Sequence, residues 1–249
     1  MIMNSLKKTL FISDLHLDEN NPEIAYMFEL WIKNTSPSTT EAIYILGDLF
    51  EAWIGDDDLT PFHDRMIKAI RSVTDKGIPV YLMHGNRDFL LGNAFLQQTG
   101  CRLLRDPSNI QLYQQSVLVM HGDTLCTRDV GYLKARKWLR NTFLQRLFLL
   151  LPLNIRKKIA ARMRKASQQH TRSVPMEMMD VTQQEVARMM KEHHVSLLIH
   201  GHTHHQGIHR FQLDDHTVSR IVLGAWHHQG SILVCDETGT CELMELTKV

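Results

Sequence analysis

The sequence predicts an α/β fold in which two β-sheets pack as a sandwich, helices flank the sheets, and a basic helical lid is inserted. Three observations support this prediction. Apolar runs of strand length alternate with helical stripes along most of the 249 residues. Several of these runs end abruptly in Gly, Asp, Asn or His, which places polar side chains at the carboxyl ends of strands. Residues 130–175 interrupt the alternation with a basic segment of their own.

The bulk composition is that of an ordinary globular protein. A chain of 249 residues can bury one sizeable core, and we expect a single domain over residues 1–249. Residues 1–8 lack the apolar stretch of a signal peptide, and no apolar run reaches the roughly 18 residues of a membrane-spanning helix. The cysteines show no CxxC spacing, so we expect four reduced, mostly buried thiols: Cys101, Cys126, Cys235 and Cys241.

The first half of the chain reads as alternating strands and helices. Four short apolar runs are expected to form strands: residues 10–13, 43–46, 80–83 and 117–120. A first helix begins at Pro22, because Pro favours the first helical turn, and apolar residues then recur at helical spacing. A second helical stripe runs from Phe62 to Val73, with Gly77 as its expected C-cap.

The second half resumes this alternation after the basic segment. Thr182 and Glu185 have the spacing of a capping box, which predicts a helix that runs to His193. The apolar residues 195–199 follow as a strand. Two closing strands are expected at residues 218–223 and 231–234. Because polar residues repeatedly follow the strands, we expect a site at the carboxyl edge of the sheets.

Residues 130–175, called here the basic arm, differ from the rest of the chain in charge. They contain twelve Lys or Arg and no Asp or Glu, whereas the whole chain has 28 basic and 27 acidic side chains. Apolar residues alternate with these charges and Pro152 breaks the pattern, which predicts two basic amphipathic helices joined by a turn. Such uneven charge favours an anionic partner, either membrane lipid or nucleic acid.

Seven side chains that follow apolar runs have the chemistry of metal ligands. His202 and His204 are two residues apart, so both side chains point to one side of an extended segment. Carboxylates combined with imidazoles suit Mn, Fe or Zn. Seven ligands are too many for one ion but fit two ions that share one carboxylate, for which Asp48 is the natural choice. The candidates are Asp14, His16, Asp48, Asn86, His121, His202 and His204.

The order of these motifs resembles the signature of the calcineurin-like metallophosphoesterases. The matching segments are Asp14-x-His16, Gly47-Asp48, Gly85-Asn86, His121-Gly122-Asp123 and Gly201-His202-x-His204. The resemblance covers residues 9–226 apart from the basic arm, and it implies a two-sheet sandwich with a dinuclear metal centre. It implies one metal held by Asp14, His16, Asp48 and His204, and another held by Asp48, Asn86, His121 and His202.

Arg87 departs from the family pattern, which usually has His after the Gly-Asn pair. That His can protonate a leaving group, whereas Arg stays protonated at neutral pH because its pKa exceeds about 12. Arg can instead bind a phosphate through two parallel hydrogen bonds. A phosphate leaving group needs no proton, since its second pKa is about 6, so Arg87 points to cleavage of a pyrophosphate. We expect catalytic roles for Arg87, Asp48 and Asn86.

A finer resemblance concerns residues 46–57, 84–90 and 223–226. These segments are similar to the branch of the family that hydrolyses the pyrophosphate bond of UDP-2,3-diacylglucosamine in lipid A biosynthesis. The resemblance implies two Mn²⁺ per chain and attack of metal-activated water on the UMP-side phosphorus. The expected products are UMP and 2,3-diacylglucosamine 1-phosphate.

The same resemblance implies substrate contacts at six positions: Asn86, Arg87, Asp129, Ser167, Thr171 and His202. Ser167 and Thr171 lie one helical turn apart and would share a face. A Lys often seen one turn beyond Thr171 is Val174 in this chain. One polar contact is therefore missing here or is supplied by Arg172.

The basic arm corresponds in position to the helical lid of that branch. A pyrophosphate with two acyl chains suits an arm that is both apolar and cationic, and we expect the arm to hold the chain on the anionic cytoplasmic face of the inner membrane as a peripheral protein. Two other functions are open: a nuclease or phosphodiesterase of the same fold that grips nucleic acid, and a non-catalytic scaffold. Arg87 speaks against nucleic acid, and the complete ligand set speaks against a scaffold. The oligomeric state is left open.

Overall fold

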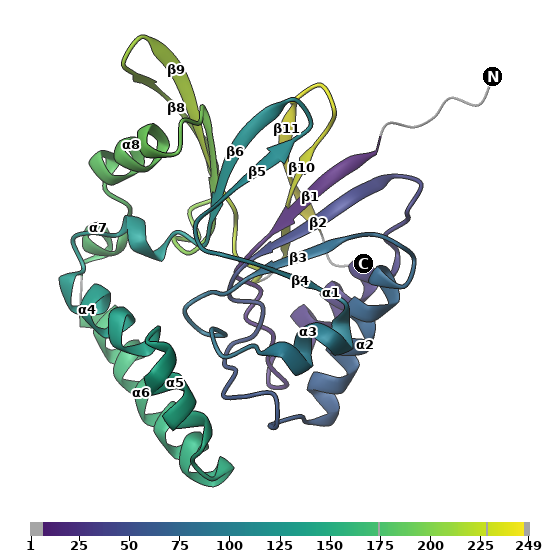
Figure 1. Cartoon of the computed structure of the whole chain (residues 1–249), viewed down its shortest axis with the longest axis vertical. Coiled ribbons are helices and arrows are strands. Elements are labelled where there is room, and N and C mark those ends of the chain that lie inside the picture. Colours follow the sequence, from purple (N-terminus) through teal and green to yellow (C-terminus); the bar gives the residue numbers. More distant parts are fainter. Residues whose placement is uncertain (1–6, 174, 228, 247–249) are drawn as a thin grey trace.

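Two mixed sheets face each other in the protein (Figure 1). The computed structural model describes residues 7–173, 175–227 and 229–246, and the side chains at 168, 170–173, 176 and 177 lie outside that description. The first sheet has six strands in the order β11-β10-β1-β2-β3-β4. These are β1 (Lys8–Ile12), β2 (Thr40–Leu46), β3 (Val80–Met83), β4 (Arg102–Leu104), β10 (Gly230–Cys235) and β11 (Cys241–Leu246).

The second sheet has five strands in the order β5-β6-β7-β9-β8. They are β5 (Ser108–Leu112), β6 (Gln115–Met120), β7 (Leu197–His200), β8 (Gly207–Leu213) and β9 (His216–Val222). Every strand expected from an apolar run is present, with its ends shifted by a few residues. The strands that the sequence did not predict are β4, β5, β8 and β11. All four lie at a sheet edge, where one face and one side are exposed and a continuous apolar run is not required.

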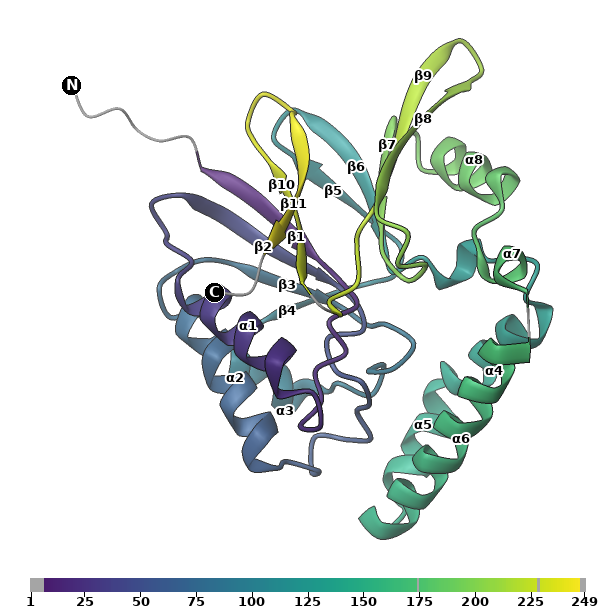
Figure 2. The same ribbon diagram turned by 180° about the vertical axis from the view of Figure 1, so that it is seen from behind.

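Helices flank the sheets (Figures 1 and 2). Three helices pack on the outer face of the first sheet: α1 (Pro22–Lys33), α2 (Pro61–Thr74) and α3 (Asn93–Thr99). Helix α8 (Gln183–Glu192) packs on the outer face of the second sheet through Val186, Met189 and Met190. The predicted sandwich flanked by helices is therefore confirmed.

The interior strands bury both faces, which explains their unbroken apolar sequences. In β2, Ile43 and Ile45 pack toward the helices α1 to α3, whereas Tyr44 and Leu46 pack into the space between the two sheets. Their neighbour Phe11 on β1 stacks on Tyr44, with ring centroids 4.8 Å apart. Successive side chains alternate between two apolar layers. Packing on both faces therefore fixes the position of these strands and of the points where the following loops begin.

The parallel strands of each sheet deliver their carboxyl ends to one region. Strands β1, β2 and β3 run parallel in the first sheet, and β6, β7 and β9 run parallel in the second. Backbone hydrogen bonds then join the loops beyond them: the N–H of His16 donates to the carbonyl of Asp48 at 3.0 Å, and that of Gly201 to the carbonyl of His121 at 2.9 Å. The loops that carry the candidate ligands therefore form one connected rim.

The basic arm contains three helices, α4 (Val130–Leu139), α5 (Thr142–Leu149) and α6 (Leu153–Ser173), and the short helix α7 (Met176–Met179) follows it. The prediction of two helices is wrong because the first is split at Asn141. The side chain of Asn141 accepts hydrogen bonds from the backbone N–H groups of Phe143 and Leu144 and so starts a new helix. Among the described residues, no helix combines the length and apolarity needed to cross a bilayer.

Several basic side chains of the arm bind the body of the protein. Arg136 pairs with buried Asp123 at 2.6 Å, and Lys157 pairs with Asp58 at 2.8 Å. Arg156 is itself buried: it pairs with Asp57 and donates to the carbonyl of Ile54 at 2.6 Å. The arm's charge therefore serves partly to fix the arm beside the sheets.

Three local predictions are wrong. Cys235 and Cys241 face each other across the antiparallel pair β10–β11 and form a disulfide, so only Cys101 and Cys126 are the buried free thiols that were expected. Thr182 is the N-cap residue of α8, but its side chain makes no cap hydrogen bond; its hydroxyl instead meets that of Thr127 at 2.7 Å. The C-cap of α2 is Asp75 and not Gly77.

Candidate metal centre

The candidate ligands lie on strained loop backbone. Five of them adopt positive φ angles: Asp14 at 54°, His16 at 49°, Asp48 at 52°, His202 at 69° and His204 at 62°. This left-handed region costs a non-glycine residue about 1–3 kcal/mol, and residues that adopt it cluster at functional sites. The loops are therefore shaped to aim these side chains at a cost in stability.

Two motif glycines allow the loops to approach each other closely. A Cβ atom on Gly85 would lie 2.1 Å from Oδ1 and 2.2 Å from the backbone nitrogen of Asp48. Gly47 has a φ of +92°, and a Cβ there would lie 2.5 Å from Nδ1 of His121. No larger residue fits these positions without moving the Asp48 loop, so the glycines of the motifs are required by packing.

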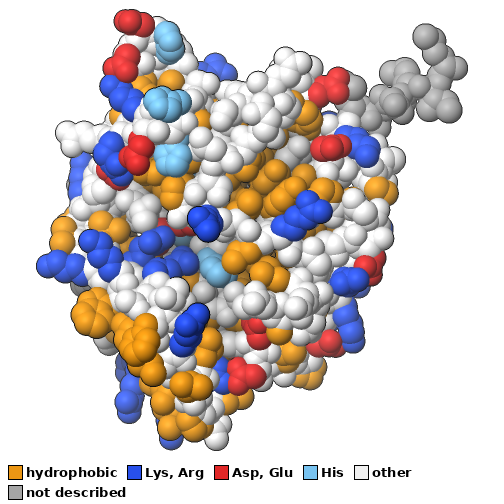
Figure 3. Space-filling model, in the orientation of Figure 1, with side chains coloured by type: hydrophobic (Ala, Val, Ile, Leu, Met, Phe, Trp, Pro, Cys, Tyr) orange, Lys and Arg blue, Asp and Glu red, His pale blue; other side chains and the backbone are white. Residues whose placement is uncertain are grey.

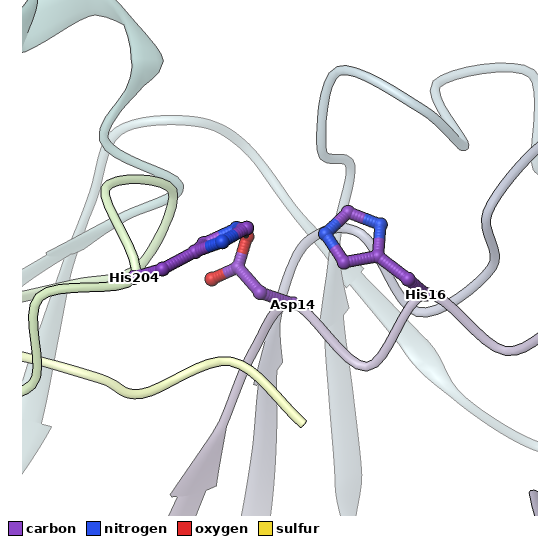
Figure 4. A group of neighbouring side chains, drawn as sticks. All are labelled: Asp14, His16 and His204. Carbon is purple, nitrogen blue, oxygen red and sulfur yellow. Dashed lines mark ion pairs between the residues drawn. The ribbon is translucent and has the colours of Figure 1, made fainter. Parts of the chain in front are cut away.

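One cluster of candidate ligands joins the loop after β1 to the loop after β7. Figure 4 shows His16 and His204 on either side of Asp14. Nε2 of His204 lies 3.4 Å from Oδ1 of Asp14, and the two imidazole centroids are 5.5 Å apart. The other oxygen of Asp14 accepts hydrogen bonds from the hydroxyl of Ser13 and the backbone N–H of His202. Ligand atoms of Asp14, His16 and His204 lie within 4.8 Å of one another.

Asp48 lies between this cluster and a second one. Its Oδ1 accepts a hydrogen bond of 2.8 Å from the backbone N–H of Arg87, which fixes the carboxylate. Its Oδ2 is 3.9 Å from Nε2 of His16 and 3.8 Å from Nε2 of His121. Asp14, Asp48 and His121 also present ligand atoms within 4.8 Å of one another. A single carboxylate oxygen therefore faces both clusters.

The second cluster is formed by Asn86, His121 and His202, which come from three different loops. Oδ1 of Asn86 lies 2.9 Å from Nε2 of His121 and 3.1 Å from Nδ1 of His202. The imidazoles of His121 and His202 meet edge to face, with centroids 5.1 Å apart. All seven candidate ligands are thus brought to one place.

The donor set fits divalent cations. Nδ1 of His121 lies 2.9 Å from the carbonyl of Leu46, and an Nδ1–H that donates to it leaves the Nε2 lone pair facing Asn86. An acceptor would then face an acceptor, an arrangement that a cation between them satisfies. Oδ1 of Asp14 is buried and has no hydrogen-bond partner among the described residues. Buried acceptors of this kind are costly unless something positive binds them.

Proton affinities in the cluster reflect its dense charge. Burial, together with the nearby charges of Asp88 and Asp14, raises the pKa of Asp48 to about 6. Burial works against protonation of His121, but the carboxylates of Asp48 and Asp14 raise its pKa to about 9, so a cation bound at Nε2 would have to displace a proton there. Burial and the charge of His121 lower the pKa of His202 to about 4. The neutral imidazole of His202 has the protonation state that metal ligation needs.

Two buried carboxylates hold the loops; both lie within the quoted motif segments but were not among the candidate ligands. Asp88 accepts hydrogen bonds from the backbone N–H groups of Leu49 and Gly85, at 2.7 and 2.8 Å, and so ties the β2 loop to the β3 loop. Asp123 accepts from the hydroxyl of Tyr132 at 2.5 Å and from Nε of Arg136 at 2.6 Å, which ties α4 to the loop after β6. Their burial could not be deduced from spacing.

Glu51 was also missed, although it stands three residues after Asp48. Its Oε2 lies 3.1 Å from Nδ1 of His16, and its Oε1 lies 3.1 Å from Nη1 of Arg87 and 3.0 Å from Nη2 of Arg164. An acidic residue that closely follows a buried strand is the one signal that could have marked it.

The arm reaches the rim of the cluster. Arg140 at the end of α4 donates to the carbonyl of Gly85 at 2.8 Å, and its guanidinium lies over the ring of Phe89. The ring of Tyr132 stacks on the imidazole of His202 with centroids 6.1 Å apart. The arm thus contacts two of the loops that carry candidate ligands.

Besides Arg87, the predicted substrate contacts outside the cluster lie in the arm or directly before it. Asp129 is buried and accepts from the backbone N–H of Tyr132 at 2.9 Å, so it caps α4. Ser167 lies exposed on α6. Thr171, Arg172 and Val174 lie outside the part of the chain whose side chains are described.

Comparison with known proteins agrees with this geometry. The family model for calcineurin-like phosphoesterases matches residues 7–206. A UDP-2,3-diacylglucosamine hydrolase of Azotobacter vinelandii is 51% identical over 231 residues, which cover 93% of this chain and 95% of the relative. One from Coxiella burnetii is 49% identical over 238 residues, covering 96% and 97% of the two chains. The chain belongs to the UDP-2,3-diacylglucosamine hydrolase family of the calcineurin-like phosphoesterases.

Proposed function

We propose that the chain is an enzyme that hydrolyses the pyrophosphate bond of UDP-2,3-diacylglucosamine to UMP and 2,3-diacylglucosamine 1-phosphate. The observation that carries this proposal is the position of Asp48, whose carboxylate faces His16 and His121 from two ligand clusters. A bridging carboxylate is what a dinuclear phosphoesterase site requires. The relatives are UDP-2,3-diacylglucosamine hydrolases, and their substrate is the one that we propose for this chain.

The residues present fit two divalent cations, which we propose are Mn²⁺. One would be held by Asp14, His16, Asp48 and His204, and the other by Asp48, Asn86, His121 and His202. Bound there, the cations would polarise the scissile phosphate and lower the pKa of an attacking water. The chain keeps the ligands in place: the Arg87 N–H fixes the Asp48 carboxylate, and the Leu46 carbonyl fixes the imidazole of His121.

Arg87 suits a reaction in which the leaving group is itself a phosphate. Its Nη1 is shared with Glu51, whereas its buried Nε has no hydrogen-bond partner among the described residues. The Arg87 side chain as a whole is 27% exposed, so we propose that the part of the guanidinium outside the Glu51 pair faces a substrate phosphate. The guanidinium would hold the diacylglucosamine phosphate as negative charge gathers on it, and no proton has to be supplied. We propose that Asn86 and His202 touch the substrate beside the metals.

The arm is proposed to bind the rest of the substrate. Helix α4 is capped by Asp129 and contacts His202 through Tyr132, so a lipid held by the arm would present its pyrophosphate to the cluster. Ser167 and Thr171 on α6 remain proposed contacts for the sugar phosphate. This arrangement would make the arm a lid over the diacyl sugar.

The arm is also proposed to seat the enzyme on the anionic cytoplasmic face of the inner membrane. Its apolar side chains are unusually exposed: Trp138 at 70%, Phe143 at 66% and Leu150 at 80%. Figure 3 shows apolar side chains gathered with Lys and Arg over the region of α4, α5 and α6. Exposed apolar residues beside basic ones suit the interface of a membrane rich in anionic lipid.

The test follows the attacking oxygen. The Mn²⁺-loaded enzyme would be incubated in ¹⁸O-water with UDP-2,3-diacylglucosamine, and the masses of the products would be measured by mass spectrometry. We expect one heavy oxygen in UMP and none in the lipid phosphate. Label in the lipid phosphate would overturn the proposed direction of attack. Turnover of single-stranded DNA without turnover of the diacyl sugar would overturn the proposed substrate.

A further inference from the structure

Glu51 occupies a junction between the metal centre and the basic arm. It lies on the loop after β2, where its backbone N–H donates to the carbonyl of Leu17 at 3.1 Å. Its side chain is 15% exposed and makes three close contacts with charged or ionisable groups. One contact is with a candidate metal ligand, one with Arg87 and one with the arm.

The two oxygens of the carboxylate serve different partners. Oε2 lies 3.1 Å from Nδ1 of His16, a close contact whose geometry falls outside that of a regular hydrogen bond. Oε1 receives Nη1 of Arg87 at 3.1 Å and Nη2 of Arg164 at 3.0 Å. Arg164 lies on α6, and its Nη1 is 3.5 Å from Asp18. One side chain thus links the β1 loop, the β3 loop and the arm.

We propose that Glu51 is a positioning residue that couples the seating of helix α6 to the orientation of His16 and Arg87. An acceptor at Nδ1 keeps the proton of His16 on that nitrogen and leaves the Nε2 lone pair pointing toward Asp48. The same carboxylate, held by two guanidiniums, aims Arg87 along the rim. The inference deepens the proposed function, because it assumes that His16 is a metal ligand.

Glu51→Gln separates the two sides of this junction while it keeps the shape of the side chain. If the amide oxygen faces the guanidiniums, its NH₂ faces Nδ1 of His16 and drives the imidazole proton onto Nε2, where it blocks ligation. If the oxygen faces His16, the NH₂ meets Arg87 and Arg164 donor to donor. Glutamine cannot satisfy both sides, so either metal binding or arm seating must suffer, and linkage between them makes both suffer.

The experiment measures two properties of the full-length, metal-loaded enzyme without substrate. The first is the Mn²⁺ retained against a graded series of chelator concentrations. The second is amide hydrogen exchange in peptides from α6. For Glu51→Gln we expect a 10- to 100-fold loss of metal affinity, the range seen when the partner of a ligating His is removed, and at least about fivefold faster exchange in α6.

The matched control is Asp58→Asn, which breaks the arm's ion pair with Lys157 but touches neither His16 nor Arg87. It should leave metal affinity within about twofold of the wild type. If Asp58→Asn lost as much Mn²⁺ affinity as Glu51→Gln does, the loss would follow from any disturbance of the arm. That result would overturn the specific role of Glu51. Wild-type metal retention or wild-type α6 exchange in Glu51→Gln would overturn the coupling.

Glu51→Asp keeps the proposal testable if Glu51→Gln does not fold. Its charge is retained, but one methylene less prevents the carboxylate from reaching His16 and both guanidiniums together. We expect at least a threefold loss of metal affinity with faster α6 exchange, and wild-type values for both would overturn the proposal. Failure of the wild-type enzyme to cleave UDP-2,3-diacylglucosamine is a separate result, since it would overturn the proposed substrate without changing either measurement.

Discussion

Asp48 is the residue on which both ligand clusters depend. In Asp48→Asn the side chain keeps its shape and can still accept from the Arg87 N–H, but it loses the charge that would offset two cations. We expect most of the bound Mn²⁺ to be lost and turnover to fall by at least about a thousandfold, or roughly 4 kcal/mol of transition-state stabilisation. Elemental analysis and kcat on the same preparation are the measurements.

The stability of the same variant separates lost metal from lost fold. Saturating Mn²⁺ at about 100 times its Kd should stabilise the wild type by roughly 2.7 kcal/mol, which raises Tm by about 5 to 10 °C for a chain of this length. Asp48→Asn should fold without metal and show little of this gain. Asp64→Asn, an exposed site on α2, should keep the full gain. If Asp48→Asn keeps the wild-type metal content and turnover, Asp48 does not bridge two metal ions.

Arg87 should matter for a phosphate leaving group and much less for an activated aryl one. Arg87→Ala should lower kcat on UDP-2,3-diacylglucosamine by about a hundredfold or more, roughly 3 kcal/mol, the scale of one lost oxyanion donor. Cleavage of a soluble aryl phosphodiester should fall by less than about tenfold, because its leaving group needs little charge stabilisation. Equal losses on the two substrates would mean that the Arg87 side chain mainly supports the site through its contact with Glu51, because Arg87→Ala keeps the backbone N–H that donates to Asp48.

Single residues were predictable where a repeated local pattern marked them. The seven candidate ligands each follow an apolar run, and the structure gathers all seven. Glu51 and Asp123 also follow apolar runs closely, but that position did not reveal their role, because their role depends on Arg164 and Arg136 of the arm. Which cations meet which carboxylates depends on how distant segments pack, and spacing in the sequence does not carry that information.

Secondary structure was predictable in proportion to burial. Strands β1, β2, β3, β6 and β7 bury both faces, and their apolar runs predicted them. Edge strand β4 has only three residues, Arg102–Leu104, and β8 mixes polar and apolar residues without a continuous apolar run or a regular alternation, so neither gives a clear strand signal. The break between α4 and α5 was not predicted either, because the cap at Asn141 interrupts an amphipathic pattern that is otherwise continuous.

The loop after β3 should tolerate no added side chain at Gly85. In Gly85→Ala the new Cβ would lie 2.1 Å from Oδ1 and 2.2 Å from the backbone nitrogen of Asp48, so the two loops must part. We expect a loss of about 1–3 kcal/mol of stability from overpacking together with a large loss of bound Mn²⁺. Thermal unfolding with and without metal measures both effects.

Gly131→Ala is the control for that substitution. Gly131 lies in the first turn of α4, and the nearest atom to an added Cβ is Oδ1 of Asp129 at 3.6 Å, an ordinary contact. Alanine in a helix should be neutral or stabilise by up to about 1 kcal/mol. If Gly85→Ala keeps wild-type stability and metal content, the two loops are less tightly packed than the structure describes.

At the scale of the whole molecule, the basic arm has two groups of charged residues with different tasks. Arg136, Arg140, Arg156, Lys157 and Arg164 bind the body of the protein. Others, including Lys134, Lys137, Arg146 and Lys158, are exposed. Composition predicted the arm and its charge, but it could not divide the charges between these tasks. Removing the whole arm would therefore disturb the loops of the metal centre as well as any membrane contact.

Substitution of exposed apolar residues tests the membrane role without that disturbance. In the triple variant Trp138→Ser, Phe143→Ser and Leu150→Ser, each lost methylene that would enter the interface removes about 0.8 kcal/mol of membrane affinity, while the contacts of Arg136, Arg140 and Arg164 with the body remain. Sedimentation with vesicles that contain anionic lipid should show at least a hundredfold weaker binding. The residual binding should depend steeply on salt, since the exposed basic residues each contribute about 1 kcal/mol near a charged surface.

The same triple variant should differ in its effect on soluble and on membrane-borne substrates. Cleavage of a soluble aryl phosphodiester should stay near the wild-type rate, because none of the three side chains contacts a candidate ligand, whereas cleavage of the diacyl sugar presented in vesicles should fall severalfold or more. Ile208→Ser with Met244→Ser, exposed on β8 and β11 away from the arm, should change neither assay. If the triple variant binds vesicles and turns over the vesicle-borne substrate as the wild type does, the exposed face of the arm has another use, and the enzyme reaches its lipid substrate by a different surface.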